Sequence, residues 1–246
     1  MTHIDPQATG YIPRNYEAYP VGYAHPVYDG PRYSISELAE LDELNEKERY
    51  SPYYIEKDNN LPVDSQGSWG YCWCWGVGNA MMNRLAAMGL DPTPRLNPHS
   101  TAYLGKRGRN QGGFGTEATR YIEQFGMAEQ KDWPGHKRIS RPSQELKDAM
   151  AVNKLVQFKE LPARDLVAVA SAILCPERSS PVSVAFNWWR HLVCAVDAHV
   201  VSGKIELVIK NSWGPNWKGD GFDTLRGRKA VPDEAIVVES VLGREE

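Results

Sequence analysis

A cysteine stands where a helix is expected to begin, and this placement favours a reactive thiolate. Cys72 opens the segment 72–88, in which apolar residues recur at helical spacing before Gly89. The unpaired backbone N–H groups and the dipole of a helix N-terminus stabilise negative charge, so they lower the pKa of a thiol there. The alternative for a lone cysteine is a buried, inert side chain, which is the commoner case. Catalysis therefore requires further groups.

One such group is an amide donor upstream of the thiol. Gln66 precedes Cys72 by six residues across a loop that contains glycine. Folded back, its side-chain amide and the N–H of Cys72 can together form an oxyanion hole for acyl transfer. The spacing alone is only suggestive of that role.

A second requirement is an imidazole with a group that orients it. His191 precedes the apolar run 192–196, and Asn211 follows the next such run, 205–210. Adjacent antiparallel strands bring the start of one beside the end of the other, so Asn211 can accept a hydrogen bond from His191 and fix its tautomer. Trp213 would then shield that bond from water.

Together these residues resemble the signature blocks of the papain-like (C1-type) cysteine peptidases. The resemblance spans about residues 61–225, and its blocks occur in the family's order. They are Gln66, Cys72-Trp73, the glycine-pair stretch Asn110-Gln111-Gly112-Gly113-Phe114, the specificity strand Pro181-Val182-Ser183-Val184, His191, Asn211-Ser212-Trp213-Gly214 and Trp217.

The resemblance implies an activity and a role for each catalytic residue. Cys72 would attack the scissile carbonyl as a thiolate, and His191 would form the ion pair and then protonate the leaving amine. Asn211 would orient His191, and Gln66 would stabilise the oxyanion. A protein or peptide is then the expected substrate, and neither a cofactor nor a metal is expected.

The resemblance also implies a set of substrate-binding residues. Gly112 and Gly113 would bind an extended substrate as an added strand. Ala185 and Leu192 map onto the apolar pocket that selects the residue two before the scissile bond, and Trp213 completes the set.

Two departures from the family pattern stand out. The family commonly joins two cysteines at the places that Trp69 and Asn110 hold here, so that disulfide is missing, in agreement with a reducing compartment. The segment before His191 is also much shorter, and it holds Trp188 and Trp189. We expect one of these indoles to reshape the primed side of the cleft.

Composition excludes several classes of protein. The chain has 246 residues, of which 41% are hydrophobic and 24% charged, with a formal net charge of -3. These values are ordinary for a globular protein. The net charge is not the large positive charge typical of proteins that coat nucleic acid, and no apolar run is long enough to span a membrane. We expect a cytoplasmic or particle-enclosed protein that is not classically secreted, with no nucleic-acid or membrane partner.

The expected fold is α+β, namely the two-lobed papain-like fold with a helical left half, an antiparallel β-barrel right half and a cleft between them. Residues 1–60 read as an extended Tyr/Pro-rich arm with one short helix from Ser34 to Tyr50, for which Ser36 is the expected N-cap. The nucleophile would lie in a helical half, 61–165, with His and Asn in a β-barrel half, 166–246. Helices are expected over 72–88, 116–125, 143–152 and 163–174, and strands over 182–186, 192–196, 205–210, 221–225 and 235–240.

Three hypotheses for function follow. The first is a cysteine endopeptidase with an acyl-enzyme intermediate. The second is a papain-like structural or binding module of a larger assembly, anchored to neighbouring subunits by residues 1–60, with activity reduced, lost or limited to self-processing. In the third, the arm lies through the cleft and inhibits the enzyme.

Overall fold

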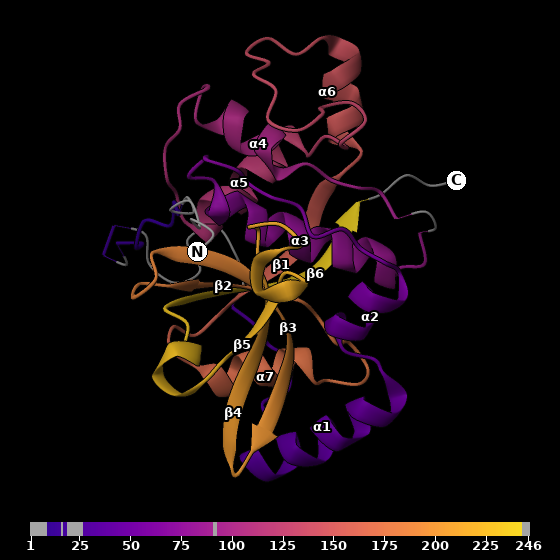
Figure 1. Ribbon diagram of the computed structural model, residues 1–246, viewed down its shortest axis with the longest axis vertical. Helices are drawn as coiled ribbons and strands as arrows, with labels where there is room; N and C mark the ends of the chain where they lie inside the picture. The colour runs from indigo at the N-terminus through magenta and orange to yellow at the C-terminus, as the bar shows by residue number, and fades with distance from the viewer. Residues whose placement is uncertain (1–8, 16, 19–26, 91–92, 243–246) are drawn as a thin grey trace.

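The described part of the chain, residues 9–15, 17–18, 27–90 and 93–242 of a computed structural model, passes from mostly helices to mostly strands (Figure 1). Most predicted elements are present within a few residues of their expected bounds. The helices are α1 (Ile35–Glu48), α2 (Pro52–Asp58), α3 (Cys72–Ala87), α4 (Pro98–Gly105), α5 (Gly115–Phe125), α6 (Gln144–Ala151) and α7 (Leu166–Ile173). The strands are β1 (Lys154–Leu161), β2 (Val182–Phe186), β3 (His191–Val201), β4 (Lys204–Lys210), β5 (Phe222–Leu225) and β6 (Glu234–Leu242).

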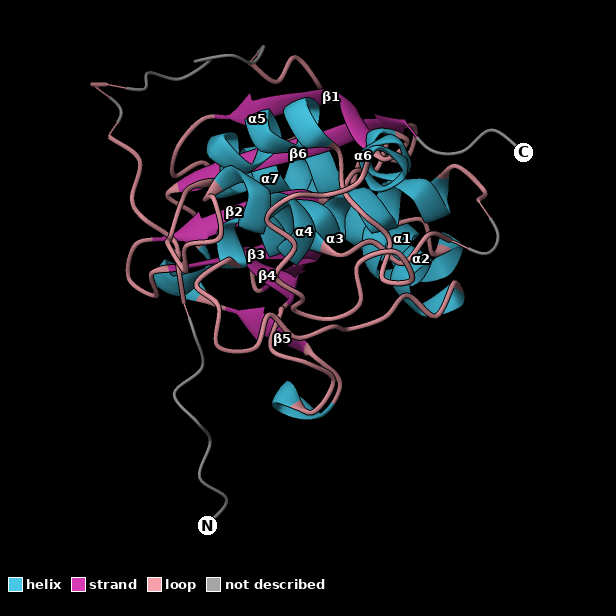
Figure 2. Ribbon diagram, turned by 90° about the horizontal axis from the view of Figure 1, so that it is seen from above, coloured by secondary structure: helices cyan, strands magenta, loops and turns pink. Residues whose placement is uncertain are grey.

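The strands form one six-stranded sheet in the order β1-β6-β2-β3-β4-β5, and every neighbouring pair is antiparallel (Figure 2). Strand β1 was not predicted. It lies inside the segment 61–165, which was expected to be helical, and it pairs with β6 near the other end of the chain. The sheet therefore takes a strand from the segment that also carries Cys72.

Alternate residues of the sheet enter two different hydrophobic cores, as the two-residue period of a strand requires. In β3, Leu192 and Cys194 belong to the core that also contains the buried residues of α3, α4 and α5. Val193 and Ala195 belong to the core on the other face, which α7 and Leu38 of α1 complete. The sheet thus lies between two helical layers, and α1 lies at the foot of the view in Figure 1.

The central helix α3 packs directly on the sheet, since nearly all of its residues are buried. Gly76 permits this approach to the sheet, and Gly78 permits a close approach of α4. A Cβ at Gly76 would lie 2.2 Å from Cδ2 of Leu192, and a Cβ at Gly78 would lie 2.4 Å from Cγ of Pro98. The backbone of α3 therefore lies against the strand that carries His191.

The segment before α3 contains two helices, whereas the sequence predicted one. The N-cap of α1 is Ser34, because its hydroxyl accepts the N–H of Glu37 while the Glu37 carboxylate accepts the N–H of Ser34. The prediction of Ser36 as the cap was wrong. Pro52 occupies the first turn of the unpredicted helix α2, where a missing N–H carries no cost.

Among the described residues, no helix combines the length and the apolar character needed to cross a membrane. The four cysteines are free thiols, and all are buried. Cys74 of α3 packs in the core, and burial raises its pKa.

Candidate active site

Cys72 is the first residue of α3, and its side chain is completely buried. Its Sγ accepts a hydrogen bond from the backbone N–H of Gly10 at 3.1 Å. Burial raises the pKa of Cys72 to about 12 and outweighs the backbone hydrogen bonds that favour the thiolate, among them those of Leu192 and Gly10. The lowered pKa expected from the helix N-terminus is therefore wrong for this conformation, because the N-terminal segment buries the sulfur.

His191 and Asn211 lie side by side, at the start of β3 and directly after β4. These two strands are paired, with Cys194 opposite Lys210. Nε2 of His191 and Oδ1 of Asn211 are 2.8 Å apart, and Oδ1 also accepts the N–H of Ser212 at 2.7 Å. The antiparallel register thus produces the pair that the two sequence runs predicted.

The second ring nitrogen of His191 remains open. Nδ1 is buried and has no hydrogen-bond partner within the described residues. Burial lowers the pKa of His191 to about 4, against the smaller opposite effect of its hydrogen bond to Asn211. The ring is therefore neutral near pH 7, and Nδ1 is available for a proton while Nε2 is held.

Indoles cover this histidine. Trp213 stacks on it with ring centroids 4.4 Å apart, and Trp189 meets it edge-on at 4.8 Å. Trp188 stacks on Trp189 but is 47% exposed. Beside them lies a surface pocket of about 470 Å³, lined by Trp188, Trp189, Trp213, Trp217 and charged residues that include Lys218 and Arg226.

Gln66 is joined to the Asn211 loop. Its backbone N–H donates to the carbonyl of Ser212 at 2.8 Å, and its Oε1 accepts the Ser212 hydroxyl at 2.5 Å. One N–H of its side-chain amide donates to the carbonyl of Trp69 at 2.7 Å. The side chain is completely buried, so its orientation is fixed by contacts with both halves of the site.

Leu192 links the nucleophile to the histidine strand. It follows His191 directly, it hydrogen-bonds through its backbone with Cys72, and its side chain packs on Gly76. In β2, Ala185 is its register partner. The structure therefore brings Ala185 and Leu192 together, one residue from His191.

Residues 9–15 of the predicted arm lie along the edge at which the sequence predicts substrate binding. Gly113 donates its N–H to the carbonyl of Gly10 at 2.9 Å and accepts the N–H of Ile12 at 2.8 Å, which makes a parallel bridge to Tyr11. Tyr11 also donates its backbone N–H to the carbonyl of Arg190 at 3.2 Å, and its side chain is 2% exposed. Gly113 thus pairs with an extended strand, but the strand belongs to the same chain.

Gly112 contributes to this edge through its size. A Cβ there would lie 2.4 Å from the carbonyl oxygen of Gly10. A larger residue at 112 would therefore keep the arm from pairing with Gly113.

Three charged residues near the site were not predicted. The side chains of Arg14 and Glu160 form a hydrogen-bonded ion pair and are 1% and 2% exposed. Glu234, the register partner of Ala185 in β6, is equally buried. Arg14 and Glu160 are 146 residues apart in sequence, so no local pattern could have revealed their contact.

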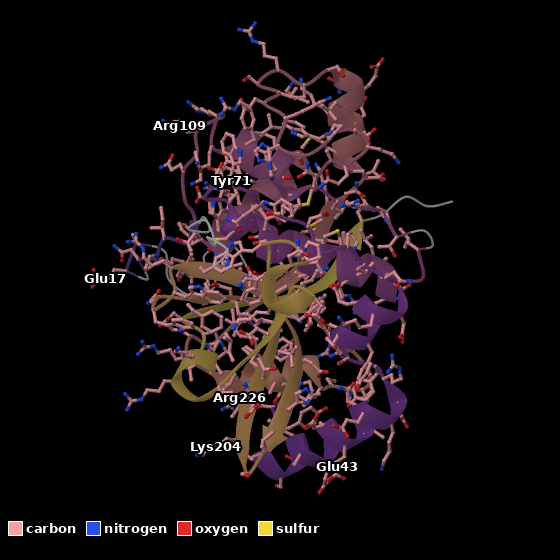
Figure 3. All side chains as sticks on the ribbon, in the orientation of Figure 1. Glu17, Glu43, Tyr71, Arg109, Lys204 and Arg226 are labelled. Carbon is pink, nitrogen blue, oxygen red and sulfur yellow. The ribbon has the colours of Figure 1, made fainter. Side chains whose placement is uncertain are left out.

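Tyr71, the N-cap of α3, holds the loop that leads to the glycine pair. Its hydroxyl donates to the carbonyl of Arg109 at 2.8 Å. Figure 3 shows Tyr71 within the helical half and Arg109 at its outer edge. Tyr71, the residue before Cys72, therefore has a structural role.

Comparisons with known proteins give relatives among cysteine proteinases, although no family model matches the chain. It is 26% identical over 217 residues to cysteine proteinase 1 of Entamoeba histolytica, covering 77% of this chain and 67% of that one. It is 25% identical over 194 residues to mexicain of Jacaratia mexicana, covering 70% of this chain and 85% of mexicain. The solved structure of xylellain, a cysteine protease from Xylella fastidiosa, matches with a TM-score of 0.67 at 16% identity and covers 95% of this chain and 97% of xylellain.

Proposed function

We propose that this chain, a relative of the papain-like (C1-type) cysteine peptidases with their fold, cleaves peptide bonds through a thiolate at Cys72. One observation carries the proposal. His191 is held through Nε2 by Asn211 at 2.8 Å, while its buried Nδ1 is left unpaired beside the strand residue that hydrogen-bonds with Cys72. An imidazole oriented by a third group, with its other ring nitrogen unpaired, is one part of what a thiol nucleophile requires of its base.

The first half of the reaction forms an acyl-enzyme. Nδ1 of His191 takes the proton from the Cys72 thiol, and Sγ attacks the carbonyl carbon of the scissile bond. The negative charge on the carbonyl oxygen is stabilised by the Gln66 amide and the N–H of Cys72. His191 then gives its proton to the amine as the C–N bond breaks.

The second half releases the acid. Water attacks the thioester carbonyl and His191 takes a proton from that water; as the S–C bond breaks, His191 gives this proton to Sγ, which returns the Cys72 thiol and the neutral imidazole. Asn211 keeps the imidazole in one tautomer throughout, and the indole of Trp213 excludes water from their hydrogen bond. Neither half needs a cofactor.

The conformation described here is, on this proposal, a latent one. Gly10 contacts the sulfur, and its neighbours pair with Gly113, which is the edge expected to bind substrate. A substrate strand can pair there only after residues 9–15 leave. This docking within the chain favours the autoinhibitory interpretation of the arm over anchorage to a neighbouring subunit.

The proposal is tested with the full-length chain carrying Gly10→Val, in which the valine side chain prevents the arm from packing against Gly70. We expect hydrolysis of fluorogenic peptide amides that is lost in Cys72→Ser and kept in Cys74→Ser. Iodoacetamide should alkylate Cys72 much faster than Cys74, Cys175 or Cys194, as peptide mapping by mass spectrometry would show. Equal, slow labelling of all four thiols together with no hydrolysis would rule the peptidase out.

A further inference from the structure

A buried cluster of charge lies where the arm meets the sheet. Nη1 of Arg14 bonds the Glu160 carboxylate of β1 and lies 3.3 Å from the hydroxyl of Thr116 in α5. Because both charged side chains are nearly inaccessible to water, this contact is desolvated and strongly sensitive to the loss of either partner. The guanidinium group of Arg14 is therefore held by a buried ion pair and a hydrogen bond.

A second carboxylate in the cluster is only partly satisfied. Oε1 of Glu234 accepts the backbone N–H of Thr116 at 3.1 Å, but Oε2 is buried without a hydrogen-bond partner within the described residues. Burial raises the pKa of Glu234 to about 7, and the charge of Arg14 acts in the opposite direction. A buried acceptor of this kind represents unused binding capacity for a donor.

The cluster adjoins the proposed substrate-binding edge. Thr116 is three residues after Gly113, and Glu234 is the register partner of Ala185. Gly115 makes room for the carboxylate, because a Cβ there would lie 3.1 Å from Oε1 of Glu234. The pocket that the sequence predicted to be apolar, at Ala185 and Leu192, thus has an acidic neighbour contributed by β1 and β6.

We propose that Glu160, Glu234 and Thr116 form an acidic pocket that selects an arginine or lysine side chain two residues before the scissile bond. Arg14 occupies this pocket in the latent state, and its departure with the arm leaves the pocket open to substrate. The inference rests on the proposed peptidase function and names its substrate class.

Charge explains why a neutral side chain is rejected. A bound guanidinium or ammonium group compensates both buried carboxylates, whereas an apolar side chain displaces water from them and supplies no donor. A site built to bond a charged group discriminates strongly against an analogue that lacks the charge.

The experiment uses the full-length chain with Gly10→Val and Arg14→Ala. The first change prevents the arm from packing against Gly70, and the second removes the guanidinium group that fills the pocket. The substrates are peptide aminocoumarin amides that differ only in the residue two before the scissile bond. That residue is arginine, its neutral isostere citrulline, or leucine. We expect kcat/KM for arginine to exceed that for citrulline by about 10- to 100-fold. Glu234→Gln in the same background should reduce this ratio to below about 3, while Glu206→Gln, a carboxylate of β4 remote from the cluster, should leave it unchanged.

Each outcome of this experiment either supports or contradicts the acidic pocket. A ratio near one, or a preference for leucine, in the chain with both carboxylates intact overturns the acidic pocket, and this measurement does not depend on whether Glu234→Gln folds. Cleavage without an arginine preference leaves the peptidase proposal standing and reduces Arg14 to an anchor for the arm. Failure to cleave any peptide, with Cys72 no more reactive than the other thiols, instead removes the peptidase proposal itself.

Discussion

The backbone N–H of Gly10 donates to Sγ of Cys72 at 3.1 Å, and a Cβ on Gly10 would lie only 1.9 Å from the carbonyl oxygen of Gly70. The residue that covers the nucleophile therefore has to be a glycine. The rest of the arm's pairing, at Gly113 and Arg190, depends on this close approach.

Replacement of Gly10 by valine should release the arm. The side chain collides with backbone at Gly70, which cannot move aside cheaply, so we expect the rate of Cys72 alkylation to rise by about 10-fold or more relative to the unaltered chain. Pro13→Ala changes an exposed residue of the same segment and serves as the control. Equal alkylation rates in the three proteins would show that the arm does not limit access to the thiol.

Removal of the histidine's partner should lower catalysis. In the chain with Gly10→Val, Asn211→Ala takes away the acceptor of the Nε2 hydrogen bond, and we expect kcat/KM to fall by about 10- to 100-fold, part of the 10²- to 10⁴-fold that acid–base catalysis typically supplies. Asn211→Asp keeps an acceptor and adds negative charge, so it should restore activity in part. It should also raise the pKa of His191 and move the histidine limb of the pH–rate profile to higher pH. A merely structural role for Asn211 would leave that limb unmoved.

The contact between α3 and β3 should couple packing to activity. Gly76→Ala places a methyl group 2.2 Å from Leu192, so it should shift the strand that carries His191 and cost about 1–3 kcal/mol of unfolding free energy. Gly78→Ala meets Pro98 instead and should have a similar cost. With Gly10→Val also present to release the arm, we expect kcat/KM to fall much further in Gly76→Ala, and equal losses in the two variants would contradict this coupling.

A buried ion pair holds the end of β4 beside the site. Nζ of Lys210 and Oε2 of Glu56 are 2.5 Å apart, and Asn83 donates to the other carboxylate oxygen at 3.3 Å. Lys210→Met leaves a buried charge uncompensated, so urea unfolding should show a loss of about 3–5 kcal/mol. The double variant Glu56→Gln/Lys210→Met should recover much of this loss. A double variant no more stable than Lys210→Met would show that the loss does not come from an uncompensated charge on Glu56.

Stability should depend on pH through Glu234. Burial raises its folded-state pKa from the ordinary 4.5 to about 7, so the folded chain binds a proton more tightly than the unfolded chain does. The resulting stabilisation is present in full below about pH 4.5 and is lost as the pH rises through about 7. Glu234→Gln should remove this part of the pH dependence of the unfolding free energy, and an unchanged dependence would show that Glu234 does not titrate in this range.

Much of the fold could be predicted because its signals are local. Apolar spacing and a terminal glycine define α3, and alternating or β-branched runs define β2 to β6. Strand β1 was missed, because its residues gain stability only by pairing with β6, far along the chain. The sequence predicts Ser36 as the N-cap of α1, although Glu37 forms a capping box with Ser34.

The groups that could do the chemistry are recognisable from the sequence, since Gln66, Cys72, His191 and Asn211 have characteristic types and order. The state of that site, in contrast, follows from tertiary contacts. The pKa of Cys72 is set by burial beneath Gly10, and the acidic cluster exists because β1, β6 and the arm meet. Both effects depend on distances between residues far apart in the chain, and desolvation, unlike helical or strand periodicity, leaves no pattern in the sequence.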